Sequence, residues 1–346
     1  MIDRVVLDAI RARADTLDAS GAWPTEDLND LARAGIMRSA IPRGFGGEDC
    51  SALEIHLRYE QIAAASLSVA LILSQRDSAC SLIDGADTST VRAELLTQLA
   101  RNEWFTTVGI AQLTTSRQRG APALLATRTS DGYRLRGEIP WSTGADHAKY
   151  IIAGAVTDVG QQILFALPRD LPGVHVAPPL PLVALGCTHT STVICEDAVL
   201  DNRLILTGPA EQVLSNRRRN LSIGQSFLAM GLCRGGLDLI EQIDSPTARA
   251  SKAELGSQLL ALRQDVLTFT ELKSTDAALA AKLRGQVNDL AVRITHAAVA
   301  LHKGSALLAG HPAQRLARES MFLLVWSCPN PVIDCTVELL SNAPRD

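Results

Sequence analysis

The sequence has few aromatic residues, no excess of basic residues and no paired cysteine motif. Aromatic side chains make up only 4% of the 346 residues, while abundant Ala and Leu help raise the hydrophobic share to 47%, a composition typical of close-packed helices. The seven cysteines include no Cys-x-x-Cys pair, which argues against a disulfide framework and against a structural zinc site. With a formal net charge of −4 the chain lacks the basic face of a nucleic-acid-binding protein.

Long apolar stretches are also missing. None reaches the roughly 18 residues that a membrane span requires, and the charged start of the chain lacks the apolar centre of a signal peptide. We therefore expect a soluble, cytoplasmic protein with reduced thiols and neither a nucleic-acid nor a membrane partner. No metal site is expected, because helical spacing is broken between His302 and His311, the two histidines that lie close together near the end of the chain.

The patterning changes twice along the chain. Residues 1–102 read mostly as helices, including one that starts at a capping box of Ser51 and Glu54 and continues towards Asp77. Residues 103–207 contain short β-prone segments separated by Gly, Pro or Asp turns, and residues 208–346 contain long helical patterns. We predict an α+β protein with an N-terminal helical domain, a central antiparallel β domain and a C-terminal helical bundle.

One loop within the central region combines residue types that suit a planar ligand. The segment from Pro140 to Gly144 places Trp141 beside the hydroxyls of Ser142 and Thr143, between two predicted strands. A glycine lets a backbone approach a ligand closely, and a flat aromatic ring can pack on a cofactor. The alternative is a core tryptophan beside an ordinary hairpin loop, because tryptophan is usually buried for packing.

Several motifs together resemble the acyl-CoA dehydrogenase superfamily, and the resemblance covers nearly the whole chain. They are Ile-Pro-x-x-Phe-Gly-Gly at 41–47, Gly-Tyr-x-Leu-x-Gly-x-x-x-Trp-Ser-Thr-Gly at 132–144, Gly-Ser-Ala-Leu at 304–307 and Pro-Ala-Gln-Arg-Leu-Ala-Arg-Glu at 312–319. The run from Trp141 to Ala148 is also similar to the flavin-dependent monooxygenases that share the fold.

The resemblance implies a flavin site and an oligomer. In the superfamily the Trp-x-Thr motif packs against the flavin ring and hydrogen-bonds to it, and the stretch around Gly304 reaches the cofactor from a neighbouring subunit. The expected cofactor is FAD, with FMN or a lost flavin as alternatives, and the expected assembly is a homodimer or homotetramer. The cofactor-binding residues that the resemblance implies are Trp141, Ser142, Thr143, Thr115, Ser116 and Gly304.

The departures from the family pattern concern the cofactor clamp and the catalytic base. The family's Arg-x-x-Phe-Gly is missing, and only Arg249 stands nearby as a substitute. Dehydrogenation of a thioester needs a carboxylate within reach of the α-proton, but the two family positions fall at Ser327-Cys328 and at 217–219, an arginine run. The remaining catalytic candidates are His147, Asp334 and Glu338.

Three functions remain open from the sequence. The first is an acyl-CoA dehydrogenase-like oxidoreductase that acts on an acyl thioester or a related small molecule. The second is a flavin-dependent monooxygenase or oxidase, which needs no strong carboxylate base because reduced flavin and O2 carry the chemistry. The third is a catalytically degenerate homologue that serves as the partner of an active subunit.

Overall fold

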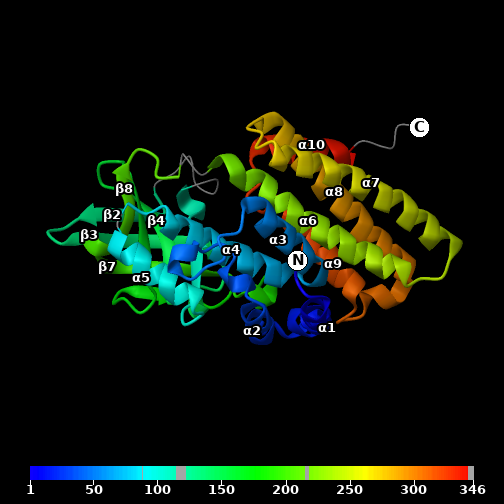
Figure 1. The fold of residues 1–346 in the computed structure, drawn as a ribbon, viewed down its shortest axis with the longest axis horizontal. Coiled ribbons are helices and arrows are strands. Elements are labelled where there is room, and N and C mark those ends of the chain that lie inside the picture. The colour runs from blue at the N-terminus through cyan, green and yellow to red at the C-terminus, as the bar shows by residue number, and fades with distance from the viewer. Residues whose placement is uncertain (88, 114–121, 215–217, 342–346) are drawn as a thin grey trace.

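The computed structural model describes residues 1–87, 89–113, 122–214 and 218–341, and it confirms the predicted α+β class. Figure 1 shows the strands gathered at one end of an elongated molecule, with α6–α10 towards the other end. Helices before the strands are α1 (Arg4–Ser20), α2 (Thr25–Arg33), α3 (Ala52–Ala65), α4 (Leu67–Asp84) and α5 (Ser89–Ala100). Helices after them are α6 (Arg218–Glu241), α7 (Pro246–Glu271), α8 (Ala277–His302), α9 (Pro312–Val325) and α10 (Asn330–Ser341).

The described strands form one eight-stranded sheet in the order β6-β7-β3-β2-β4-β5-β8, with β1 paired to β4 off this path. Most neighbours are antiparallel, as predicted, but β1 and β2 each run parallel to β4. Periodicity in a sequence does not report strand direction, so these parallel pairs were not predictable from the pattern. The strands are β1 (Thr106–Gly109), β2 (Leu124–Arg128), β3 (Gly132–Ser142), β4 (Tyr150–Thr157), β5 (Gln162–Pro168), β6 (Val174–Val176), β7 (Ser191–Asp201) and β8 (Ile205–Ala210).

The helix starting at Ser51 is shorter than predicted. Its capping box is present, because the Ser51 hydroxyl accepts from Glu54 N and the Glu54 carboxylate accepts from Ser51 N. The helix ends at Ala65, however, because Ser66 has an extended backbone and its side chain caps α4. Serine favours a cap over a helix interior because its hydroxyl can bond to the backbone, so a single Ser separates two helices here.

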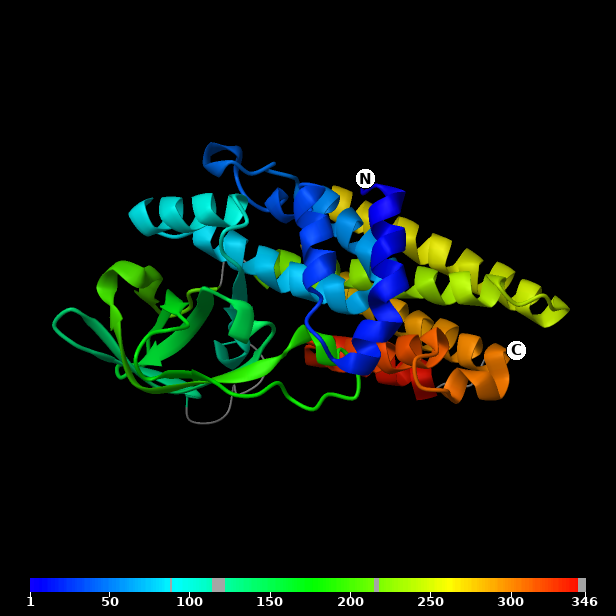
Figure 2. The same ribbon diagram turned by 90° about the horizontal axis from the view of Figure 1, so that it is seen from below.

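Two hydrophobic cores hold the fold together. One lies within the helical bundle, where α3 and α8 pack on α6; the other lies between the sheet and helices α4 and α5. Figure 2 shows α4 and α5 on one side of the strands. Strands β4 and β5 are buried along nearly their whole length, which explains why their sequences are apolar throughout instead of alternating.

The strand region is followed closely by the helical bundle. Strand β8 runs to Ala210, three residues past the predicted end of the β domain at residue 207. The division into three domains stays a prediction. Arg318 of α9 donates to Val183 O at 2.6 Å and pairs with Asp18 of α1, so the bundle is tied to the connection that leads into β7. Within the described residues, no helix is both long and apolar enough to cross a membrane.

Candidate functional site

Trp141 lies at the end of a strand and not in a hairpin loop. The pairing of β3 with β7 continues through an irregularity to Ser142, which pairs with Ser191, so the predicted loop is partly strand. Trp141 has a φ of 58° and is 55% exposed. An exposed ring is not a core tryptophan, and the left-handed backbone of a bulky residue costs on the order of 1–3 kcal/mol unless its surroundings impose it.

Gly144 explains why the motif needs a glycine. Its φ is 62°, and an added Cβ would lie 2.6 Å from the ring of Trp23. Its amide donates to Thr188 O at 3.0 Å, which fastens the segment after Trp141 to the segment before β7. This contact therefore fixes the position of the whole motif.

Ser142 faces the interior of the sheet. Its side chain is fully buried, its hydroxyl has no hydrogen-bond partner among the described residues, and a Cβ added at Gly109 would lie 2.9 Å from that hydroxyl. A side chain in this position cannot touch a ligand on the Trp141 side of the strand. The predicted contact of Ser142 with a cofactor would have to come from its backbone.

Thr143 belongs to a chain of buried hydroxyls. The Thr188 hydroxyl donates to Leu185 O at 2.7 Å, so it accepts from Thr190 at 2.9 Å, and Thr190 in turn accepts from Thr143 at 3.1 Å. The proton of Thr143 is therefore committed to Thr190, and its oxygen offers only lone pairs to any further partner. Leu185 has a φ of 62°, so this chain ends, like Trp141, in a left-handed backbone.

His147 lies in a cluster with His189, Asp146 and Trp23. Its Nε2 is 3.0 Å from His189 Nδ1 and 3.4 Å from Asp146 Oδ2, and its ring stacks on Trp23 with centroids 4.0 Å apart. Burial lowers the pKa of His147, so the imidazole is neutral at physiological pH. The cluster thus places a neutral acid–base group directly after the Trp141 motif in the chain.

His189 holds this cluster to the N-terminal helices. Its Nε2 donates to Gly21 O at 3.0 Å and its Nδ1 lies 3.2 Å from Asp146 Oδ2. Gly21 ends α1, and Figure 2 shows the end of this helix beside the green segment that leads towards β7. His189 also has a positive φ, 47°, as do Trp141 and Leu185, so three non-glycine residues at or near the motif have a left-handed backbone.

The other predicted site residues lie elsewhere. Thr115 and Ser116 fall outside the described residues, as does Arg217 of the arginine run. Gly304 is exposed at the start of a short 3₁₀ helix, Lys303–Leu307. Asp334 and Glu338 are exposed on α10, which packs on α8, and no hydrogen bond or ion pair of the described residues joins either of them to the Trp141 motif. None of these three is brought to the motif within one chain.

The position expected for the family's base carries no acid. Cys328 receives a hydrogen bond from Arg284 at 3.3 Å, and burial raises the pKa of its thiol. A thiol with a raised pKa is a poor nucleophile, so Cys328 behaves as a structural residue. Arg249, the substitute for the missing arginine clamp, is exposed and paired with Asp244.

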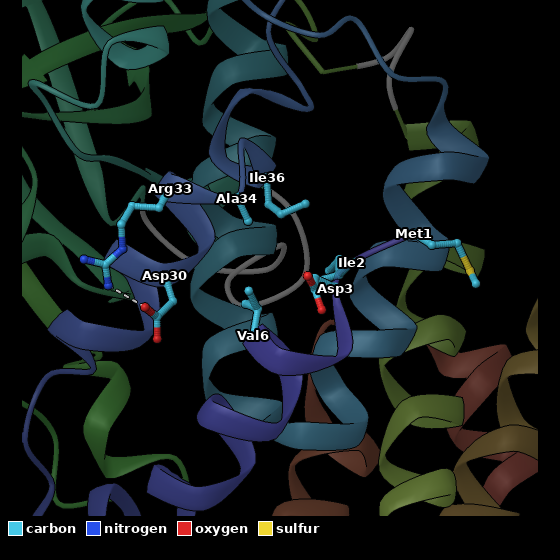
Figure 3. Close-up of a pocket in the computed structure, with 8 residues that line it drawn as sticks. All are labelled: Met1, Ile2, Asp3, Val6, Asp30, Arg33, Ala34 and Ile36. Atoms are coloured by element: carbon cyan, nitrogen blue, oxygen red, sulfur yellow. Dashed lines mark hydrogen bonds and ion pairs between the residues drawn. The ribbon is translucent and has the colours of Figure 1, made fainter.

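A hollow of about 460 Å³ lies between the start of α1 and the end of α2 (Figure 3). Asp30 and Arg33 form an ion pair at its edge. It contains no predicted site residue and none of the cluster around His147. Its lining residues are Met1, Ile2, Asp3, Val6, Asp30, Arg33, Ala34 and Ile36.

The partners of the motif were missed in the sequence. Trp23 precedes the motif by more than a hundred residues, and Thr188, His189 and Thr190 follow it across three intervening strands. The pairing of β3 with β7 brings residues 188–190 to the motif, and the bond from His189 to Gly21 O brings the connection that holds Trp23; no local pattern reports either contact. The polar run Thr188-His189-Thr190 just before a β-prone segment was the available signal.

Comparison with known proteins identifies relatives over the whole chain. Residues 1–103 match the family model "Acyl-CoA dehydrogenase, N-terminal domain". The chain is 24% identical over 343 residues to the probable acyl-CoA dehydrogenase YngJ of Bacillus subtilis (strain 168), covering 91% of this chain and 89% of that protein.

Solved structures show the same fold. Butyryl-CoA dehydrogenase from Megasphaera elsdenii superposes with a TM-score of 0.81 at 20% identity, covering 96% of this chain and 94% of that one. The FMN-bound structure of the dibenzothiophene monooxygenase TdsC from Paenibacillus sp. A11-2 superposes with a TM-score of 0.80 at 16% identity, covering 97% and 93%. One architecture thus serves a dehydrogenase and a monooxygenase.

Proposed function

The chain belongs to the acyl-CoA dehydrogenase superfamily, and we propose that it is a flavin-dependent oxidoreductase acting on an acyl thioester or a related small molecule. The observation that carries this proposal is Trp141, a 55% exposed ring held on a left-handed backbone at the position of the family's flavin-binding tryptophan. Strained backbone of this kind is found where binding requires it. The residues present therefore suit a flat aromatic cofactor.

Residues of this chain would take distinct roles around the flavin. Trp141 would pack on the ring, and Thr143, whose proton is committed to Thr190, would accept a hydrogen bond from a donor at its edge. The Gly144 contact to Thr188 O would hold both residues in place. A bound flavin supplies hydride acceptance or, once reduced, reaction with O2. We propose FAD, as in the family, with FMN as the alternative that TdsC supports.

The residues beside the motif favour oxygen chemistry over thioester dehydrogenation. The position where the family's catalytic base is expected holds Ser327 and Cys328. The ionisable group next to the motif is instead the neutral imidazole of His147, which pairs with His189. An imidazole can move a proton near neutral pH but is not the carboxylate that removes a thioester α-proton in this superfamily. We therefore propose a flavin-dependent monooxygenase or oxidase as the second candidate within the same family.

Anaerobic mixing with saturated acyl-CoAs of several chain lengths separates the two candidates. Because a positioned base contributes about 10²- to 10⁴-fold to such a rate, we expect negligible bleaching of the bound flavin. Substrate-dependent O2 uptake after external reduction of the flavin would support the oxygenase. Rapid bleaching would contradict it and make Asp334 and Glu338 the first residues to replace. A colourless protein that takes up no flavin would favour the third function, a degenerate partner subunit.

We further propose that the chain assembles as a homodimer or homotetramer. Large apolar side chains remain exposed on α9, α10 and the 3₁₀ helix before α9, near the Gly304 stretch that resembles the family's contact with a neighbouring cofactor. Exposed apolar side chains on elements that all pack against α8 favour a protein interface. The exposed residues are Leu307, Leu308, Met321, Val325, Ile333, Val337, Leu339 and Leu340.

A further inference from the structure

Asp146, His147 and His189 bring three ligand-type atoms together at the end of β3. The atoms are Asp146 Oδ2, His147 Nε2 and His189 Nδ1, and their separations are 3.0, 3.2 and 3.4 Å. These groups come from two connections, one after β3 and one before β7, which the sheet places side by side. Two imidazole nitrogens and one carboxylate are a common donor set for divalent transition metals.

Hydrogen bonding leaves this cluster rich in lone pairs. The Nε2–H of His189 donates to Gly21 O, so in the neutral imidazole its Nδ1 carries a lone pair directed at Asp146 and His147. The Asp146 carboxylate can only accept, and its Oδ1 is buried with no hydrogen-bond partner among the described residues. With His189 neutral, two acceptors face each other at 3.2 Å, and a proton on His147 Nε2 is the one that lies between them.

The spacing of the three atoms matches that around a metal ion. Atoms 3.0, 3.2 and 3.4 Å apart lie on a circle of radius about 1.9 Å, so an ion slightly out of their plane can lie about 2.0–2.1 Å from each, the usual zinc–ligand distance. In a tetrahedral or octahedral shell with these bond lengths, neighbouring ligands are separated by about 3 Å, as they are here.

We propose that Asp146, His147 and His189 form a binding site for a divalent transition metal ion of the zinc class, with at least one coordination position left open. The bond from His189 to Gly21 O is the outer hydrogen bond that metal-binding histidines commonly make, because it fixes the ring and the tautomer. The stacked ring of Trp23 orients His147 in the same way.

The site would join three parts of the chain. Gly21 and Trp23 belong to the connection between α1 and α2, Asp146 and His147 follow the Trp141 motif, and His189 precedes β7. A bound ion would therefore stiffen the motif from one side while the hydroxyl chain of Thr143 holds it from the other. This proposal does not rest on the proposed flavin chemistry, because none of its three ligands is a predicted flavin contact. A metal bound at His147 Nε2 would take the place of the proton-transfer role considered for that imidazole above.

A metal titration of the chelator-treated full-length protein tests the proposal. We expect saturable binding of one equivalent of Zn²⁺ in calorimetry, and visible absorption bands of low-symmetry coordination when Co²⁺ is used instead. The variants His147→Ala and His189→Ala should each weaken binding by at least about tenfold, the loss typical even of outer-shell partners. The control is His175→Ala, since His175 is an exposed histidine on β6 opposite Glu196, outside the cluster.

Each binding result either supports or overturns the proposed metal site. One equivalent bound by the wild type and His175→Ala but not by the cluster variants supports the site. An absence of saturable binding, or equal binding by all variants, overturns it and leaves a proton on His147 Nε2 shared between His189 and Asp146. Asp146→Asn keeps the shape of the side chain, and far-ultraviolet circular dichroism shows whether each variant is folded. The flavin absorbance of the same samples separates a failed metal site from a failed flavin site.

Discussion

The hydroxyl chain beneath the Trp141 motif makes a quantitative prediction about stability. In Thr190→Val the side chain keeps its shape but loses the hydroxyl that accepts from Thr143 at 3.1 Å and donates to Thr188 at 2.9 Å. The Thr143 hydroxyl, on a residue only 5% exposed, would then be left with an unpaired proton. An unsatisfied buried polar group costs about 1–3 kcal/mol, so we expect the free energy of unfolding to fall by about that amount.

Urea unfolding of the wild type and of two variants measures this loss. Thr192→Val is the matched control, since Thr192 lies two residues further along on β7, is half-buried and makes no side-chain hydrogen bond within the described residues. We expect a lower midpoint at an unchanged slope for Thr190→Val, and a small change for the control. Equal midpoints for the two variants would refute the hydroxyl chain and, with it, the assignment of the Thr143 proton.

Two further predictions concern pH and assembly. Burial lowers the pKa of His56 to about 4, below its unfolded value of 6.5. The contribution of neutral His56 to stability is therefore present above pH 6.5 and is lost as the pH falls towards 4. Between these pH values the free energy of unfolding of His56→Gln should fall by up to about 3 kcal/mol less than that of the wild type. Burial raises the pKa of Asp77 to about 6, which changes stability with pH in the opposite sense, but this effect is common to both proteins and cancels in the difference. The measurement is urea unfolding across this pH range, with His175→Gln as the control. Equal pH profiles for the wild type and His56→Gln would contradict the lowered pKa of His56. Light scattering at micromolar concentration should give a mass at least twice the 37.0 kDa of one chain, and a monomer would count against the proposed oligomer.

Features that depend on neighbouring residues in the sequence were predicted well. The capping box of Ser51 and Glu54 needs only a spacing of three residues, and the structure contains it. The break at Ser66 was missed, because no Gly or Pro marks it and apolar residues continue on both sides.

Features that depend on strand pairing could not be predicted in the same way. The motif identified Trp141 and Thr143, but the direction of the Thr143 hydroxyl is decided by Thr190, which directly precedes the partner strand β7. The alternation of β3 gave no warning that Ser142 faces Gly109 in the sheet interior. His147 was a candidate from its position alone, whereas its proton partners, His189 and Asp146, become apparent only once the two connections meet.

Flavin binding by Trp141→Ala is the most direct test of the proposed site. The purified wild type should show flavin absorption bands, either as isolated or after incubation with FAD or FMN. Loss of ring stacking worth about 1 kcal/mol or more should weaken flavin binding at least about fivefold in the variant. Trp104→Ala is the control, because Trp104 is half-buried against Tyr150, outside the motif. Unchanged flavin affinity in Trp141→Ala, or a wild type that takes up no flavin, would contradict the account.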